Sequence, residues 1–170
     1  MDLLQQSGSV GFDDPLGMLK ACHEKIRSHC QLLIDLCEYM KTHDADRDAI
    51  ATGRKILKYF STAAKNHHQD EELDIFPLIR HSQTVHDLIT QLEQDHQKLE
   101  KLWLLFEPIL EKDNLKKISL LETEIKAFKQ HYEEHIQTEN NQLIPEAALL
   151  LSADQLIKIG KKMRARRAVN

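Results

Sequence analysis

Two segments of the chain share one spacing of histidine, glutamate and proline. Residues 67–77 and residues 135–145 each begin with His, carry Glu four positions later and end with Pro. On a helix, residues four apart lie on the same face one turn apart. Each segment therefore presents an imidazole and a carboxylate to one point in space, which is typical of metal ligands. The two pairs are His67 with Glu71 and His135 with Glu139.

Two further histidines stand where an apolar side chain is expected. His23 interrupts the apolar stripe of the first predicted helix, and His96 interrupts that of the third. The residues around them match in pattern, and each is followed about 40 residues later by one of the His–Glu segments. Two helix hairpins that each supply His, then His and Glu, form a pseudo-twofold pair. This repeat predicts two metal ions.

The residue types indicate which metal to expect. A buried carboxylate without a partner is very costly, and a buried imidazole must satisfy both ring nitrogens. Taken singly, such a histidine is more often a core residue, and such a His–Glu pair is more often a surface ion pair. Together, at one level of the core, they favour cations between them. Imidazole and carboxylate favour iron, and no suitably placed thiolates indicate zinc. We expect two iron ions (Fe²⁺/Fe³⁺) with an oxo or hydroxo bridge, held by His23, His67, Glu71, His96, His135 and Glu139.

Other residues near these positions are candidates for a lesser role. Tyr132 lies on its stripe one turn before His135, where it can contact a bound ligand or simply pack in the core. Glu100 and His131 are each one turn from a candidate ligand, but such neighbours are often solvated or second-shell groups. The pair His68 and Glu72 points about 100° away from the first pair. We interpret it as a second-shell or solvated pair.

The elements that position these residues are predicted to be helices. Apolar residues at helical spacing predict four long helices. The first and third begin near residues 15 and 84, and the second and fourth end near residues 80 and 144. Asp14-Pro15 and Asp46 are start signals, and Pro77 predicts a kink or the last turns of the second helix. Short connections favour an all-α, up-down-up-down four-helix bundle. At 1.5 Å per residue, the six candidate ligands then fall within one slab of the core.

The termini and the composition set the domain organisation. Residues 1–13 are predicted to be a flexible arm, residues 14–150 the bundle, and residues 151–170 a basic helix packed on it, capped by Ser152 with Gln155. The net charge of −4 gives no general attraction to nucleic acid or an anionic membrane. No apolar run approaches a membrane span, and the three cysteines lie in one predicted helix at spacings that disfavour disulfides. We expect a soluble, cytoplasmic protein.

These motifs resemble the hemerythrin-like family, in particular the bacterial HHE-type cation-binding proteins. The resemblance spans nearly the whole chain and is carried by Asp14-Pro15 with the His23 helix, His67-His68-x-Asp70-Glu71-Glu72-x-x-x-Phe76-Pro77, Asp95-His96-x-x-Leu99 and Tyr132-x-x-His135-x-x-x-Glu139-x-x-x-x-x-Pro145. It implies a four-helix bundle with a non-haem di-iron centre that reacts with O₂, nitric oxide or peroxide. It also implies that the four histidines are terminal ligands and that Glu71 and Glu139 bridge the irons.

The chain departs from the oxygen-carrying hemerythrins at two positions. Glu100 stands where those proteins have a second histidine, and Asn140 stands where they have Asp. One histidine fewer leaves an additional open position, which favours sensing, scavenging or iron handling over reversible O₂ carriage. Two alternatives stay open. One is a di-iron oxidase or peroxidase; the other is a metal-stabilised interaction module whose basic segment, residues 161–167, docks an acidic partner or nucleic acid, although a solvated brace is the simpler interpretation of that segment.

Overall fold

The computed structural model describes residues 10–168, and no strand occurs among them. The elements are α1 (Pro15–Thr42), α2 (Arg47–Ser61), α3 (Ala63–Gln69), η1 (Asp70–Ile75), α4 (Phe76–Ile79), α5 (His86–Glu111), η2 (Leu115–Leu120), α6 (Glu122–Thr138), η3 (Glu139–Leu143), α7 (Ile144–Leu150) and α8 (Ala153–Ala168). The segments η1 and η3 are π-helical, and η2 is a 3₁₀ helix. The prediction of an all-α helical bundle is confirmed.

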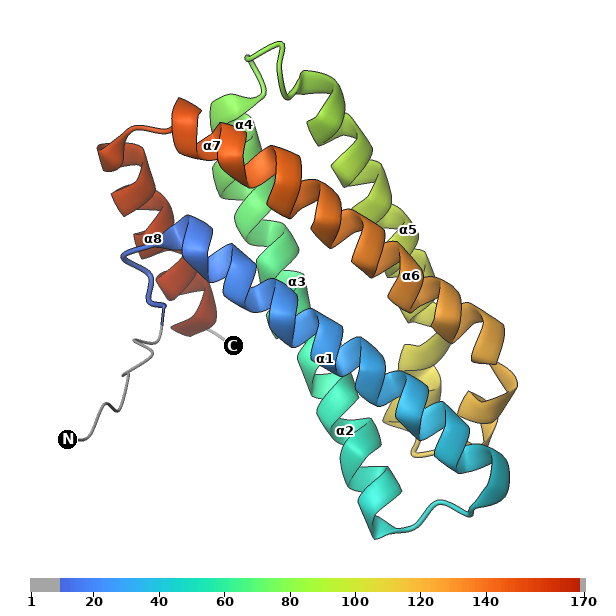
Figure 1. Cartoon of the computed structure of the whole chain (residues 1–170). Coiled ribbons are helices and arrows are strands. Elements are labelled where there is room, and N and C mark those ends of the chain that lie inside the picture. The colour runs from blue at the N-terminus through green and yellow to red at the C-terminus, as the bar shows by residue number, and fades with distance from the viewer. Residues whose placement is uncertain (1–9, 169–170) are drawn as a thin grey trace, which may run out of the picture.

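Four rods make up the body of the molecule. The first is α1 and the third is α5, whereas the second is assembled from α2, α3, η1 and α4, and the fourth from α6, η3 and α7. Both α1 and α5 pack against α2 on one side and α6 on the other. Figure 1 shows the rods side by side, with the chain turning back at each connection. The candidate ligands therefore come from four different rods.

The predicted helix starts are confirmed by their capping hydrogen bonds. The carboxylate of Asp14 accepts from the backbone N–H of Gly17 at 2.9 Å, and that of Asp46 accepts from Ala49 at 2.8 Å. At the start of α8, the Ser152 N–H donates to the Gln155 side chain, and the Gln155 N–H donates to the Ser152 hydroxyl. These bonds satisfy N–H groups that a helix start leaves without partners.

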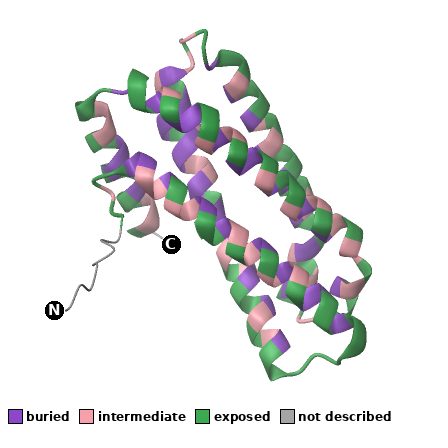
Figure 2. Ribbon diagram, viewed as in Figure 1, coloured by how far each residue is buried: buried purple, intermediate pink, exposed green. Residues whose placement is uncertain are grey.

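The buried side chains form two apolar clusters separated by a polar layer. One cluster contains Ile26 and Leu99, and the other contains Leu19 and Leu92. His23 lies in sequence between Leu19 and Ile26, just as His96 lies between the two leucines of α5. Figure 2 shows the buried residues along the inward faces of the rods. The histidine layer thus divides an otherwise continuous core.

The second rod is less regular than its apolar spacing predicts. At α-helical spacing, Leu57 and Leu78 fall on one stripe with His67 and Glu71. Both leucines are only partly buried, and Ile56 and Ile79 are fully buried instead. The helix breaks at Thr62, whose φ and ψ are −126° and −77°. It is irregular a second time in η1, where the turn is π-helical and therefore wider. Each irregularity changes the helical register, so a single stripe at α-helical spacing does not fit the whole rod.

The last helix packs against the same rod. α8 contacts α1, α3 and η1, and Figure 1 shows it beside the N-terminal end of α1. The arm predicted over residues 1–13 lies outside the described residues as far as residue 9. Among the described helices, none is both long and apolar enough to span a membrane.

Candidate metal centre

A π turn lies within each of the two repeated His–Glu segments. In η1 the N–H of Phe76 donates to the carbonyl of Glu71, and in η3 the N–H of Ile144 donates to the carbonyl of Glu139. Both bonds span five residues, and in both cases the donor immediately precedes a proline. Proline has no N–H to donate and its ring excludes the carbonyl four residues earlier, so the ordinary α pattern is broken there. The predicted kink is thus a widened turn, and π turns are frequent at functional sites.

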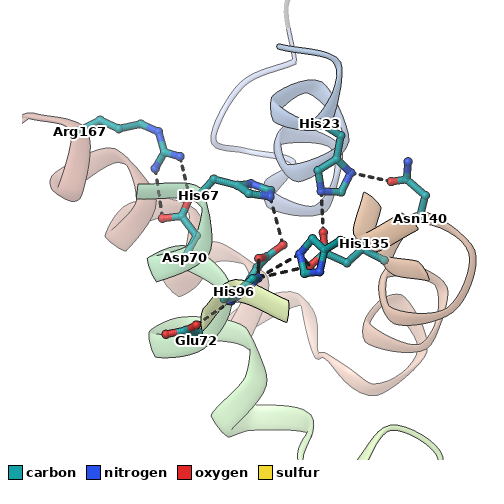
Figure 3. Close-up of polar contacts among 10 residues, drawn as sticks. His23, His67, Asp70, Glu72, His96, His135, Asn140 and Arg167 are labelled. Atoms are coloured by element: carbon teal, nitrogen blue, oxygen red, sulfur yellow. Dashed lines mark hydrogen bonds and ion pairs between the residues drawn. The ribbon is translucent and has the colours of Figure 1, made fainter. Parts of the chain in front are cut away.

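The six predicted ligands come together in the polar layer. The four histidines point toward one another from α1, α3, α5 and α6 (Figure 3). The two glutamates, at η1 and η3, each lie within 3.4 Å of two of these histidines. His96 has the largest exposed fraction of the six, at 5%. The centre is therefore almost completely buried in the protein.

Each of the two carboxylates faces two different histidines with its two oxygens. Glu71 Oε1 lies 3.4 Å from His67 Nε2, and Glu71 Oε2 lies 3.4 Å from His96 Nε2. Glu139 Oε2 lies 2.9 Å from His23 Nε2, and Glu139 Oε1 lies 3.0 Å from His135 Nε2. Two positions result, one between His23 and His67 and one between His96 and His135. Both carboxylates contribute an oxygen to each position.

The outer ring nitrogens of His23 and His96 are held by neighbouring side chains. His23 Nδ1 lies 2.8 Å from Asn140 Oδ1, and His96 Nδ1 lies 2.6 Å from Glu72 Oε1. The Asp95 carboxylate lies 3.9 Å from His135 Nδ1. An acceptor at Nδ1 keeps the proton there and leaves the Nε2 lone pair facing the centre. Glu72, predicted as a second-shell or solvated group, orients His96.

Burial and neighbouring side chains shift the pKa values of both glutamates and of His67. Burial and the nearby Glu139 carboxylate raise the pKa of Glu71 well above its usual value. Burial also disfavours ionised Glu139, but the facing His135 and His23 imidazoles hold its pKa well below the usual range. Burial and the neighbouring His23 lower the pKa of His67. One carboxylate thus favours the protonated form and the other the ionised form.

The donor set fits a pair of cations. Among the described residues, none gives either oxygen of Glu71 or Glu139 a hydrogen bond of acceptable geometry, and both ring nitrogens of His67 also lack one. Such buried, unpaired acceptors are costly unless they bind a cation. One group of candidate ligand atoms is His23, His67, Glu71 and Glu139, and a second is Glu71, His96, His135 and Glu139; the two groups share both glutamates.

A further histidine borders the second position. His68 stacks on His96 with ring centroids 3.9 Å apart, and its Nε2 is buried without a hydrogen-bond partner among the described residues. Burial and the neighbouring His96 lower the pKa of His68. Its ring nitrogens fall in one potential ligand group with those of His96 and His135. The sequence signal for this residue is the His-His dipeptide, and the 100° offset predicts that the His68 ring leaves the face shared by His67 and Glu71.

The three lesser candidates lie at different depths. Tyr132 is buried beside Phe128 and His68, with ring centroids at 5.0 and 5.9 Å. Glu100 is exposed at the mouth of a cavity next to His96. His131 is exposed on α6 and belongs to neither group of ligand atoms. The geometry therefore brings Tyr132 near the centre and leaves His131 outside it.

The acidic residue before Glu71 fixes the basic C-terminal helix. Asp70 is fully buried and accepts from Arg166 and from both terminal nitrogens of Arg167, the latter at 3.1 and 2.6 Å (Figure 3). Asp74, one turn on, pairs with Arg166 at 2.7 Å and with Lys162 at 3.1 Å. Three basic residues of α8 therefore form ion pairs with the segment that carries Glu71.

The fold and centre define a helical bundle with a buried cluster of histidines and glutamates that could bind cations, and the comparisons agree with this class. The family model of the hemerythrin HHE cation binding domain matches residues 14–147. A protein of Haemophilus influenzae, described as uncharacterized, is 34% identical over 171 aligned residues that cover 99% of both chains. The chain belongs to the hemerythrin HHE cation-binding family.

Proposed function

We propose that this protein is a non-haem di-iron protein that binds or reacts with O₂, nitric oxide or peroxide, as a sensor, a scavenger or an iron-handling protein. One iron would be held by His23 and His67 and the other by His96 and His135, with Glu71 and Glu139 bridging them. The observation that carries the proposal is the division of each carboxylate between the two histidine pairs. Both halves of the repeat contribute two histidines and one glutamate, which favours two metal positions.

The protein's own part is to hold the ligands, exclude water and leave room for a ligand. Asn140 and Glu72 fix two imidazoles with Nε2 toward the centre, and the apolar clusters on either side close it. Iron supplies coordination positions at which a small molecule such as O₂ can bind and accept electrons. His23 and His67 are almost completely buried, whereas the side of His68 and His96 borders a cavity. A ligand from outside would therefore reach the second position.

Iron content tests the proposal first. We expect about two iron ions per chain after anaerobic reconstitution with Fe²⁺, and an optical spectrum that changes on mixing with O₂. Less than about one iron per chain would rule out a two-metal site. A spectral change that reverses when O₂ is removed would indicate binding, and one that persists would indicate scavenging or turnover.

Substitutions test which carboxylates hold the iron. Glu139→Ala should lose most of the bound iron, because it removes one oxygen from each position. Glu134→Ala, in α6 of the same rod, should lose none, because Glu134 is exposed. Glu71→Ala should likewise cost far more iron than Glu72→Ala, which removes only the support of His96. Equal losses from the two members of either pair would contradict the assignment.

An oxidase or peroxidase is the second candidate, and the cavity beside His96 favours it. Its volume is about 590 Å³, which is enough for an organic reductant or substrate. The interaction module receives less support, because Lys162, Arg166 and Arg167 are paired within the chain. Multiple turnovers of peroxide with an added organic reductant would distinguish the enzyme from a stoichiometric binder.

A further inference from the structure

The cavity beside the centre is much larger than a diatomic ligand needs. The cavity has a volume of about 590 Å³ and lies between α2 and α3 on one side and α5 on the other. Phe128 and Tyr132 of α6 also line it. A water molecule occupies about 30 Å³ in the liquid, so the cavity is roughly twenty times larger than one water molecule. Pockets for small organic molecules have volumes of this order. Its inner wall includes His68 and His96, so an occupant would lie beside the second metal position.

The wall of the cavity is rich in aromatic rings. The Phe60 ring lies 5.0 Å from Trp103 and 5.2 Å from Phe128 between ring centroids, and Tyr132 lies 5.0 Å from Phe128. Trp103 is 8% exposed, and its indole N–H has no acceptor among the described residues. Aromatic faces bind flat or apolar molecules and also attract cations. Phe60, Tyr132 and Trp103 keep 5%, 4% and 8% of their surface exposed, so the wall offers a small aromatic contact area, of the size that a single ring of a ligand, including a cationic one, can cover.

The charged residues of the lining favour a positive ligand. They are four carboxylates and one ammonium, so their formal charges sum to −3; the residues are Glu72, Glu93, Glu100, Glu107 and Lys65. Glu93 is partly balanced by Arg80, and Glu107 accepts a hydrogen bond from Ser61 at 2.9 Å. Glu100 and Lys65 are exposed. An anion entering the cavity would meet a surplus of like charge.

We propose that this cavity is a binding site for a small organic cation, an aromatic amine in its ammonium form, beside the second metal position. The amine is an arylalkylamine, such as benzylamine, whose nitrogen is not on the ring and is protonated at neutral pH. Its ring would pack against the aromatic wall, and its ammonium group would lie near the carboxylates of the mouth. The proposal extends the proposed function by naming a second ligand of the same centre, and rests on it only in that respect. The cavity itself is formed by protein side chains alone.

The single tryptophan makes the test direct. Trp103 is the chain's one tryptophan, so a ¹⁵N–¹H correlation spectrum contains one indole N–H resonance, and that resonance reports on the cavity. The full chain, metal-free and Zn²⁺-loaded, is titrated with benzylamine, benzyl alcohol and benzoate, which are similar in size and differ in charge. We expect benzylamine to move the resonance saturably with a Kd on the order of 1 mM. Benzyl alcohol should bind about threefold more weakly, and benzoate should give no saturable shift.

A charge-reversal variant tests the role of the mouth without touching the core. Glu100→Lys should weaken benzylamine binding by about threefold, whereas Glu111→Lys, an exposed change on the same helix outside the cavity, should leave it unchanged. Benzoate binding as tightly as benzylamine would overturn the proposed ligand class. The absence of any saturable shift in both forms of the protein would overturn the site. Iron content is measured separately, so a failure of the metal proposal is distinguishable from a failure of this one.

Discussion

Arg167 donates hydrogen bonds to both carboxylate oxygens of Asp70, the buried residue that immediately precedes Glu71. The basic C-terminal helix is thereby tied to the π turn that presents a candidate bridging carboxylate. Removing one member of a buried ion pair is destabilising, because the other charge then stays buried without a partner. The ion pair therefore connects the stability of α8 with the position of Glu71.

The first prediction concerns this ion pair. Asp70→Asn should destabilise the metal-free protein by about 3 kcal/mol, because it leaves Arg166 and Arg167 partly buried without their shared counter-charge. Asp154→Asn, an exposed change at the start of α8, should alter stability by less than about 0.5 kcal/mol. Urea unfolding followed by circular dichroism measures both. Equal midpoints for the two variants would mean that the pair carries little stability.

The second prediction concerns the prolines that follow the π turns. Pro77→Ala and Pro145→Ala restore an N–H that can donate four residues back, so the helix can return to the α pattern and rotate the glutamate away from the centre. Each variant should bind iron about tenfold more weakly. Pro108→Ala is the matched control, because Pro108 is also exposed but lies within α5, beyond His96. Competition with an Fe²⁺ chelator measures the affinities, and unchanged values for both variants would separate the prolines from the geometry of the centre.

The third prediction concerns His68. Its ring belongs to the same potential ligand group as His96 and His135, so His68→Asn should weaken the second metal position and leave the first intact. Bound iron should then fall from about two ions per chain toward one. His131→Asn, which changes an exposed histidine, should retain both ions. Full retention of iron by the His68 variant would show that the ring only packs on His96.

The fourth prediction concerns the cysteines. All three are free, and burial raises the pKa of Cys22, Cys30 and Cys37. A raised pKa lowers the fraction of reactive thiolate at any pH below it, so native protein at pH 8 should react with iodoacetamide at least about tenfold more slowly than a free cysteine. In guanidinium chloride all three should react. Rapid modification of any native cysteine, located by mass spectrometry, would contradict the burial.

The sequence predicts the all-α bundle and the helix starts because both depend on local chemistry. Leu19 and Leu92 mark buried faces by helical periodicity, and Asp14 and Asp46 cap helices through bonds to residues three positions on. The His–Glu pairs face one centre because residues four apart share a face. These inferences need no knowledge of the other helices.

The remaining features depend on contacts between elements. Pro77 predicts an irregularity, but a widened turn instead of a bend could not be read from the sequence. His68 points away from His67 on its own helix, yet in the bundle that direction faces α5, where the ring meets His96. Asp70 reads as one acid among several until α8 brings Arg167 against it. His68 and Asp70 thus acquire their roles from neighbours distant in the sequence.

The central claim is that Glu71 and Glu139 each join two metal positions. The most direct measurement is anomalous diffraction at the iron edge from crystals of the anaerobically reconstituted protein. The account predicts two peaks about 3.5 to 4 Å apart, one beside His23 and His67 and the other beside His96 and His135, with both carboxylates between them. A single peak, or iron bound away from these two glutamates, would contradict it.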